Sequence, residues 1–145
     1  MKLNRRILAI LIFLVLVVVG FLIYNANYKP EVENYEKPSP SEVVGQYFTA
    51  WSNKDYPNLY ATISDGFKRI EPTAKGFNTF KEYVNSQGVE NVNVFSIKEI
   101  SNDGKTATVD YSIEFILLNG KKQKLDDTFT LKYRTGDIIQ GWKLI

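Results

Sequence analysis

The sequence of 145 residues contains no cysteine, no histidine and a single methionine. Without cysteine there can be no disulfide framework, no thiolate metal site and no lipid attached to a thiol. Nucleophile–base systems built on cysteine or histidine are excluded as well. Any catalysis would have to use carboxylates, tyrosine, lysine or serine. We expect neither a cofactor nor a bound metal ion.

The sequence also has little net charge outside its N-terminus. The formal charge is +2, but from residue 39 onward there are 13 lysines and arginines against 13 aspartates and glutamates. A neutral domain offers no basic footprint for the phosphates of a nucleic acid. We therefore expect no nucleic-acid partner.

One long apolar run is present, at residues 7–23, directly after Lys2, Arg5 and Arg6. As an α-helix it would be about 26 Å long, close to the bilayer hydrocarbon core of about 30 Å. Because positive residues flank its N-terminal side, we expect a single-pass anchor in the cell membrane with a cytoplasmic N-terminus. Residues 1–24 are thus predicted to be a cytoplasmic stub and a transmembrane signal anchor.

The alternative is a cleaved signal peptide, whose apolar region is usually about 7–15 residues long and ends at a small-x-small site. The run is longer here, and Tyr24 occupies a position that should be small; Gly20 with Val18 would be a weaker site. Both alternatives place the following domain outside the membrane. Residues 25–38 are polar and contain prolines, which favours a semi-stiff tether.

The central element of the domain is predicted at residues 105–134, as two long β-strands that meet at Asn119 and Gly120. Apolar side chains occupy every second position, so one face packs and the other meets water. These positions are Ala107, Val109, Tyr111, Ile113, Phe115, Leu125, Phe129, Leu131 and Tyr133. The apolar faces match only if the loop has three residues, Leu118 to Gly120, with a left-handed glycine.

This register predicts specific pairs across the hairpin. They are Ala107 with Leu131, Val109 with Phe129, Ile113 with Leu125 and Glu114 with Lys124. It also places Asp127 opposite Tyr111, as the one polar pairing on the apolar face. The same loop geometry at residues 102–104 predicts that Ile97 pairs with Val109.

Helices are predicted ahead of the sheet. Ser39 and Glu42 form a capping box for a helix that runs to about Ser52 with one apolar, aromatic stripe. A second helix follows Asp55, its expected N-cap, and ends near residues 64–66. The remaining predicted segments are an irregular stretch at 67–76, a short helix at 79–86, a strand at 89–101 and a last strand at 138–145.

We therefore predict an α+β domain over residues 39–145, with three helices packed on a curved antiparallel sheet of about four long strands. The pattern resembles the nuclear transport factor 2-like superfamily, whose cone-shaped fold wraps a curved sheet around a long helix. The residues that carry the resemblance are Tyr47-Phe48-Thr49-Ala50-Trp51, Asp55-Tyr56, Leu59-Tyr60, Phe80, Thr106-Ala107-Thr108-Val109 and Gly141-Trp142-Lys143.

Within that superfamily the chain looks most like the non-catalytic N-terminal domain of penicillin-binding transpeptidases, where a similar pattern precedes a Phe-x-x-Tyr helix, here Phe80 to Tyr83. It departs from them because no transpeptidase domain follows in this sequence. A membrane-tethered copy also resembles the extracytoplasmic domains of secretion and conjugation assembly factors. The resemblance thus implies an envelope protein that binds a protein partner.

Enzymes of the superfamily use an inward aspartate or tyrosine in the apolar cone, which would make Asp127 a general base and Tyr111 a hydrogen-bond donor. A structural role for this pair is the alternative that we favour. The residues expected to line a pocket are Tyr47, Trp51, Tyr60, Tyr83, Tyr111, Phe129 and Trp142; a simple apolar core is again the alternative. The lysines at 121, 122 and 124 fit a solubilising turn or a contact with an anionic surface.

Two functional hypotheses follow from the sequence. The first is a membrane-anchored extracytoplasmic binding or scaffold domain without enzymatic activity, acting in envelope or secretion assembly. Its partner would be an unknown envelope protein or a second copy bound through the sheet. The second is a small-molecule binding protein, or an isomerase or dehydratase, that uses the cone interior.

Overall fold

The computed structural model describes residues 17–21, 23 and 37–145. The chain divides into two units, Met1–Tyr35 and Glu36–Ile145. In the first unit, residues 17–21 and 23 are helical. Among the described residues, no helix is long and apolar enough to cross a membrane. Most of the predicted anchor at 7–23, and the predicted tether up to residue 36, lie outside the described residues.

The second unit begins with the predicted capping box. Helix α2 (Pro40–Ser52) starts where the Ser39 hydroxyl accepts a hydrogen bond from the backbone NH of Glu42, at 3.3 Å. The Glu42 carboxylate in turn accepts one from the Ser39 NH, at 2.6 Å. This reciprocal pair satisfies two donors that a helix start leaves open. The predicted start and end of this helix are confirmed.

Three further α-helices follow, and they are α3 (Tyr56–Ala61), α4 (Asp65–Ile70) and α5 (Phe77–Ser86). Asp55 caps α3, as predicted, but the predicted end of this helix near residues 64–66 was wrong, because α3 ends at Ala61 and Ser64 caps a new helix. The prediction of irregular structure at 67–76 was wrong, because α4 and the short 3-10 helix η1 (Pro72–Ala74) lie there. Helix α4 is capped by Ser64 but has no fully buried residue. Its sequence therefore lacks the apolar stripe by which a helix is usually predicted.

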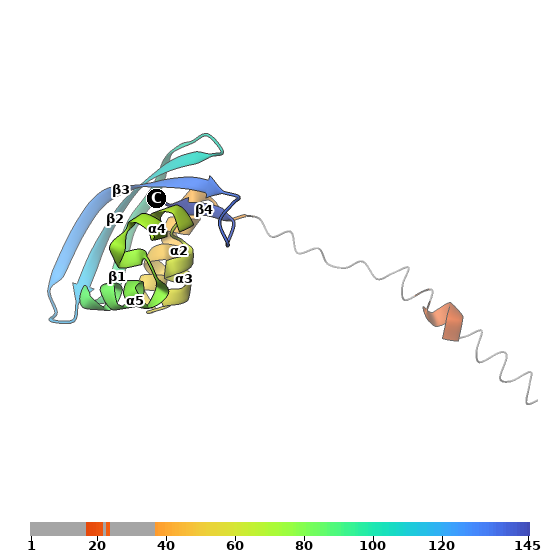
Figure 1. The fold of residues 1–145 in the computed structure, drawn as a ribbon, viewed down its shortest axis with the longest axis horizontal. Coiled ribbons are helices and arrows are strands. Elements are labelled where there is room, and N and C mark those ends of the chain that lie inside the picture. The colour runs from red at the N-terminus through yellow and green to blue at the C-terminus, as the bar shows by residue number, and fades with distance from the viewer. Residues whose placement is uncertain (1–16, 22, 24–36) are drawn as a thin grey trace, which may run out of the picture. The chain divides into compact units, whose positions relative to one another are not determined.

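The sheet contains β1 (Val89–Asn102), β2 (Thr106–Leu117), β3 (Lys122–Arg134) and β4 (Gly141–Leu144). It is antiparallel in the order β1-β2-β3-β4 (Figure 1). The predicted class, an α+β domain with a four-stranded antiparallel sheet, is therefore confirmed. The last strand is shorter than the predicted 138–145, because residues 135–140 form a loop instead.

The register of the β2–β3 hairpin is the predicted one in every pair, including Tyr111 opposite Asp127. Its turn is closed by hydrogen bonds from the Leu117 NH to the Lys121 carbonyl and from the Gly120 NH to the Leu117 carbonyl. Gly120 has a φ of 77°, the left-handed conformation expected of it. The alternation of apolar residues thus determined the pairing correctly.

The register of β1 against β2 was predicted wrongly. Ile97 pairs with Tyr111, not with Val109, and Glu99 takes the place opposite Val109. The cause is the turn, where the Asp103 NH donates to the Thr106 carbonyl and Asn102 pairs with Ala107, so the predicted three-residue loop at 102–104 was wrong. Strand β1 also has three irregularities, where Glu90, Phe95 and Ile100 are skipped in the pairing, and they bring the register back to the predicted one at Val89 and Leu117. Each adds one residue to β1 and bends the strand. An alternation pattern cannot place such insertions.

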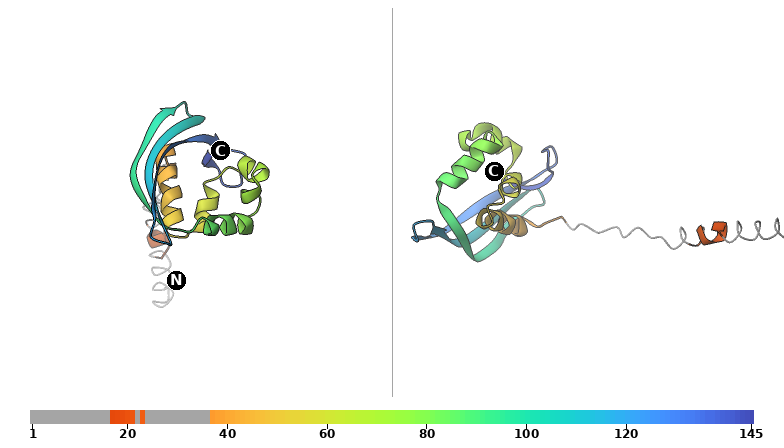
Figure 2. Two further views of the ribbon diagram at one scale, coloured as in Figure 1. Left: turned by 90° about the vertical axis from the view of Figure 1, so that its left-hand side faces the viewer. Right: turned by 90° about the horizontal axis from the view of Figure 1, so that it is seen from below.

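Two clusters make up the core of the described domain. In one, α2 packs against the concave face of the sheet through Val44, Phe48, Val109, Ile113 and Leu131. In the other, the opposite side of α2 meets α3 and α5 through Ala50, Leu59, Phe80 and Val84. Helix α2 therefore lies between the sheet and the other helices (Figure 2).

Candidate functional site

A cavity of about 650 Å³ lies between α2, α3 and β4. This volume falls in the range of about 300–1,000 Å³ that is typical of small-molecule sites. Residues 37–38 and 139–141 contribute to its walls. The lining residues are Lys37, Pro38, Val43, Gln46, Thr49, Ala50, Asn53, Asp55, Asn58, Ala61, Thr62, Tyr133, Ile139, Gln140, Gly141, Trp142 and Lys143.

The cavity has a mixed lining that suits binding. The indole of Trp142 and the ring of Tyr133 lie edge-to-face with centroids 5.5 Å apart and supply an aromatic wall. Gln46 and Thr49 on α2, with Asn53 at its C-terminal cap, bring amide and hydroxyl groups to the lining. Such groups donate and accept hydrogen bonds but do not titrate near neutral pH. These three side chains can therefore orient a ligand without ionising.

Asp55 is the acidic residue of the lining, and its carboxylate is already engaged. It accepts hydrogen bonds from the backbone NH of Asn58 at 3.3 Å and from the Asn58 side-chain amide at 2.6 Å. Both bonds hold the first turn of α3. Asp55 thus has the structural role that the sequence predicted for it.

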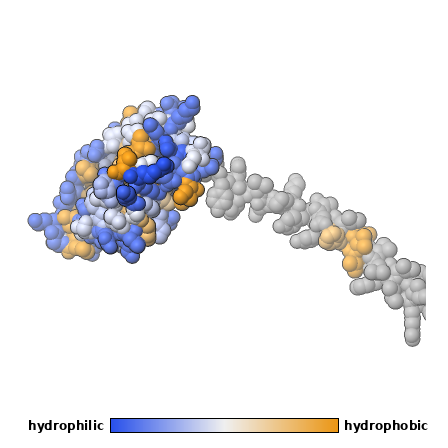
Figure 3. All heavy atoms as spheres, viewed as in Figure 1, coloured by the Kyte–Doolittle hydropathy of each residue, from blue (hydrophilic) through white to orange (hydrophobic). Residues whose placement is uncertain are grey.

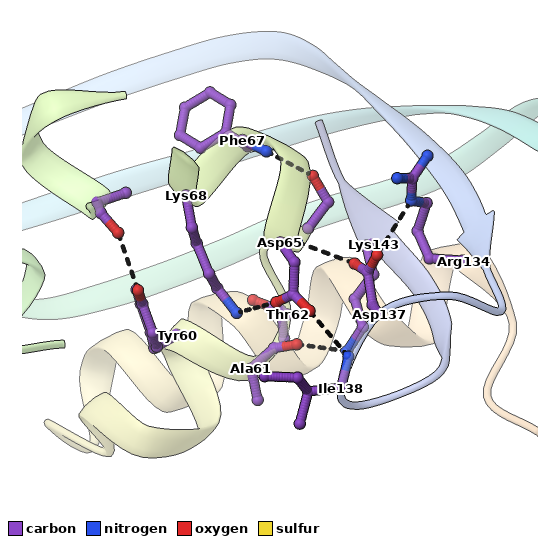
Figure 4. Close-up of polar contacts among 12 residues, drawn as sticks. Tyr60, Ala61, Thr62, Asp65, Phe67, Lys68, Arg134, Asp137, Ile138 and Lys143 are labelled. Carbon is purple, nitrogen blue, oxygen red and sulfur yellow. Dashed lines mark hydrogen bonds and ion pairs between the residues drawn. The ribbon is translucent and has the colours of Figure 1, made fainter. Parts of the chain in front are cut away.

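Lys143 brings a buried cation to the cavity wall. Only 6% of the residue is exposed, and its ammonium donates to the Ala61 carbonyl at the end of α3. Burial, and next the positive charge of Lys68, lower the pKa of Lys143, while Asp137 and Asp65 oppose that shift. The ammonium therefore belongs to a network of charges behind the cavity (Figure 4).

Two carboxylates form the centre of this network. The backbone NH of Asp65 donates to Asp137 Oδ2 at 2.9 Å, and the backbone NH of Ile138 donates to Asp65 Oδ2 at 2.8 Å (Figure 4). Lys68 pairs with Asp65 Oδ1 at 3.2 Å, and Arg134 with Asp137 Oδ1 at 3.3 Å. The network ties the β3–β4 loop to the start of α4.

The pKa of the Asp65 carboxyl is lowered from its usual value. The largest cause is the hydrogen bond from the Ile138 NH; burial opposes it, and Lys68 reinforces it. Because these bonds favour the ionised form, Asp65 is a carboxylate at neutral pH. It is a structural anion rather than a proton acceptor for a ligand.

The sequence did not predict this network. Asp65 and Asp137 are 72 residues apart, and each stands beside a glycine in a stretch whose pattern indicates a turn or a helix end. Ser64 ahead of Asp65 is the only local signal, since serine is a preferred N-cap. The cavity was missed for the same reason, because its walls come from three distant segments.

Of the predicted pair, Tyr111 is buried and Asp127 is exposed. Strand β4 pairs only with residues 131–134 of β3, so the β3 edge at Asp127 has no further strand beside it in the described sheet. Asp127 Oδ1 accepts a hydrogen bond from the backbone NH of Thr128 at 2.8 Å. Burial, and secondarily Asp127, raise the pKa of Tyr111 to about 12. The two residues are thus paired across the strands as predicted, but only Tyr111 is buried in the core, while Asp127 faces solvent.

The predicted pocket aromatics are distributed over three places. Trp142 lines the cavity. Tyr111 stacks on Phe129 at 4.6 Å between centroids, Tyr47 meets Phe129 at 5.5 Å, and Trp51 meets Tyr47 at 5.6 Å, which together fill the space between α2 and the sheet. The remaining two, Tyr60 and Tyr83, lie in the helical layer, where Tyr83 is exposed.

Two groups inside the aromatic cluster are notable for their polar atoms. The Trp51 indole NH is buried without a hydrogen-bond partner among the described residues, next to the rings of Tyr47 and Phe115. Burial also raises the pKa of Tyr47, helped by Tyr111 and Tyr83. Across the residues that the structure describes, no group of three acidic side chains is placed to hold a metal ion.

No protein-family model matches the sequence. A curated relative, the serine/threonine-protein kinase PknA of Nostoc sp. (strain PCC 7120), is 23% identical over 103 residues. Those residues cover 69% of this chain but only 18% of the kinase. The chain therefore spans less than a fifth of the length of that relative.

Among solved structures, a SEC-C motif containing protein from Rhodopseudomonas palustris has a TM-score of 0.52 and 14% identity, covering 74% of this chain and 77% of the other. An NTF2-like protein of unknown function from Burkholderia pseudomallei has a TM-score of 0.45 and 15% identity, covering 69% and 86%. The first likeness concerns the fold alone. Membership of the nuclear transport factor 2-like superfamily stays a prediction.

Proposed function

We propose that this protein is a membrane-tethered, extracytoplasmic binding domain without enzymatic activity, and that its cavity receives part of an envelope partner. The observation that carries the proposal is the cavity between α2, α3 and β4, with its aromatic wall and its row of amide and hydroxyl groups. Its location outside the cell rests on the sequence alone, on the apolar run at 7–23 and the positive residues before it.

The charged groups near the cavity favour binding over catalysis. Asp55, Asp65, Asp137 and Lys143 are each held by hydrogen bonds or ion pairs within the fold. A general acid or base needs a pKa near the working pH and a position within reach of the substrate. Asp65 has a lowered pKa and binds backbone groups instead. Asp55 and Lys143 line the cavity, and Asp65 and Asp137 hold the neighbouring loop in place.

The match to a small part of the kinase supports a non-catalytic domain that can be joined to other domains. The alignment covers 18% of the kinase, and this sequence has no histidine to match the His-Arg-Asp motif of a kinase catalytic loop. We infer that the shared stretch is a non-catalytic part of that protein. The resemblance to penicillin-binding transpeptidases and to secretion assembly factors supports the same kind of role here, with an envelope protein or a second copy as partner.

The alternative function is a small-molecule binding protein or an isomerase-type enzyme that uses the space between α2 and the sheet. Aromatic rings occupy much of that space, and Asp127 lies on the solvent side of Tyr111. We favour the binding domain because Asp127 is exposed on an open strand edge and is not enclosed with a ligand between α2 and the sheet.

The test is site-specific photocrosslinking in native membranes. A photoreactive phenylalanine analogue replaces Gln46, which is exposed and faces the cavity from α2. The matched control carries it at Asn78, an exposed helical residue on α5 that is not among the cavity residues. We expect a discrete crosslinked product from position 46 that is absent from position 78. Equal, diffuse crosslinking at both positions would mean that the cavity is not the binding site.

A further inference from the structure

The loop between β3 and β4 presents two neighbouring isoleucines to solvent. Ile138 is 94% exposed and Ile139 is 56% exposed. Single exposed apolar residues are common on soluble proteins, whereas contiguous exposed apolar surface marks a contact site. The rest of the visible surface is mixed, with small hydrophobic areas between hydrophilic ones (Figure 3).

The fold holds this loop in place. Asp137, directly before Ile138, is buried and accepts hydrogen bonds from the Asp65 NH and from Arg134. The Ile138 backbone NH is itself bound to Asp65 Oδ2 at 2.8 Å. The backbone of the loop is thus fixed at the tip while the isoleucine side chain stays exposed. A fixed apolar tip loses little conformational freedom when it inserts into another phase.

The loop lies at the end of the domain where the chain enters from its N-terminal part. Lys37 and Pro38 line the same cavity as Ile139 and Gln140. The β2–β3 turn, which contains Leu118, lies at the opposite end of the sheet from β4 (Figures 1 and 2). The residues between the predicted anchor and Lys37 are 24–36, which reach at most about 45 Å when fully extended.

A cationic side chain accompanies the apolar tip. Lys37 lies over the ring of Tyr133, with its Nζ 5.3 Å from the centroid, and lines the same cavity as Ile139. The acidic residues beside the tip are both paired, Asp137 with Arg134 and Asp65, which binds the Ile138 NH, with Lys68. An apolar tip next to a lysine matches the chemistry of an anionic lipid surface, because acyl chains receive the isoleucines and headgroups attract the ammonium group of Lys37.

We propose that the loop at residues 135–140 is a second membrane contact, in which Ile138 and Ile139 insert into the anionic lipid surface beside the anchor. The proposal rests on the proposed membrane tethering, since two isoleucines alone would bind lipid weakly and depend on the high local lipid concentration that a tether gives. It sets the orientation of the domain, with the β2–β3 turn directed away from the membrane.

The absence of cysteine allows a direct test with the full chain. Single cysteines at Ile138, Leu118 or Val17 are labelled with an environment-sensitive fluorophore, and the protein is reconstituted into phosphatidylcholine and phosphatidylglycerol vesicles. Lipids with brominated acyl chains then quench a label that lies among the chains. Leu118 is the matched control because it is 72% exposed at the far turn.

We expect quenching at positions 17 and 138 and none at position 118. Quenching at 17 without quenching at 138 would overturn the proposed loop contact and leave the tethering intact. Absence of quenching at 17 would overturn the tethering itself. Quenching at 118 in place of 138 would show the opposite orientation and would also overturn the proposal.

A second label keeps both isoleucines in the chain. A cysteine at Gln140, exposed in the same loop, should also be quenched by brominated lipid, and Ile138→Ser with Ile139→Ser in that background should abolish the quenching. Both isoleucines are exposed, so the fold should persist, as far-UV circular dichroism can verify. Unchanged quenching in the double variant would show that the isoleucines do not insert.

Discussion

Two reciprocal hydrogen bonds link Asp65 and Asp137, because each carboxylate accepts from a backbone NH at or next to the other residue. Asp137 Oδ2 accepts from the Asp65 NH at 2.9 Å, and Asp65 Oδ2 accepts from the Ile138 NH at 2.8 Å. Two negative side chains can lie this close because each is compensated, Asp65 by Lys68 and Asp137 by Arg134. The pair joins the helical layer to the last turn of the sheet and so holds one side of the cavity in place.

The first prediction concerns the stability that this pair supplies. Asp137→Ala leaves the Asp65 NH and Arg134 without their partner in a buried position, which should lower the unfolding free energy by about 1–3 kcal/mol. Urea denaturation measures the change. The matched control is Asp126→Ala, whose carboxylate is exposed and 3.7 Å from Lys124 and should cost at most about 0.5 kcal/mol. Equal effects of the two substitutions would contradict the role assigned to Asp137.

The stability of the domain should depend on the ionisation of Asp65 at acidic pH. The pKa of Asp65 is lower in the folded than in the unfolded chain, so the unfolded chain binds more protons in the acidic range. Its contribution to stability is present above the unfolded pKa of about 3.9 and is lost as pH falls through the folded pKa. Asp65→Asn should therefore reduce the slope of the unfolding free energy against pH below about pH 5. Part of the slope should remain, because the pKa values of Glu42 and Asp103 are also lowered. An unchanged slope in chemical denaturation at several pH values would be the opposing result.

The sequence predicted the parts of the fold that follow from repeated local patterns. The β2–β3 register follows from alternation along both strands, and the start of α2 follows from Ser39 and Glu42. The β1–β2 register does not, because the turn closes between Asp103 and Thr106 and the extra residues Glu90, Phe95 and Ile100 then shift the pairing along β1. Nothing local in the sequence brings Asp65 to Asp137.

The candidate site was less accessible to sequence reasoning than the fold. Trp142 was the one predicted pocket residue that lines the cavity, and the amides of Gln46 and Asn53 were not singled out. Polar residues on the outer face of an amphipathic helix usually meet solvent. Only the position of α3 and β4 turns that face into the wall of a cavity.

The third prediction uses two glycines in loops. Gly120 has a left-handed φ of 77°, so Gly120→Ala should destabilise the domain by about 1 kcal/mol or more. Gly136 has no such φ, and a methyl group added to its Cα would meet open space, so Gly136→Ala should be neutral or stabilising by up to about 1 kcal/mol. Thermal unfolding of the two variants compares them directly. Equal losses in both would mean that the left-handed turn is not what Gly120 provides.

The fourth prediction separates the two functional hypotheses. Asp127 is exposed and raises the pKa of Tyr111 only as a secondary cause, so Asp127→Asn should lower that pKa from about 12 while burial keeps it above the usual tyrosine value of about 10. The unfolding free energy should stay within about 0.5 kcal/mol of the parent value. NMR of ring-labelled tyrosine follows the ionisation, and denaturation follows the stability. If Asp127→Asn instead abolished binding of a small molecule, the enzyme hypothesis would gain over the scaffold.

We propose that an N-terminal anchor holds the domain outside the membrane. Because the chain has no cysteine, it can be tested with Leu118→Cys, exposed at the far turn, and with Lys2→Cys, before the apolar run. A membrane-impermeant maleimide is applied to intact cells and again after permeabilisation. We expect Leu118→Cys to react in intact cells and Lys2→Cys to react only after permeabilisation. Labelling of position 118 only after permeabilisation would contradict the account.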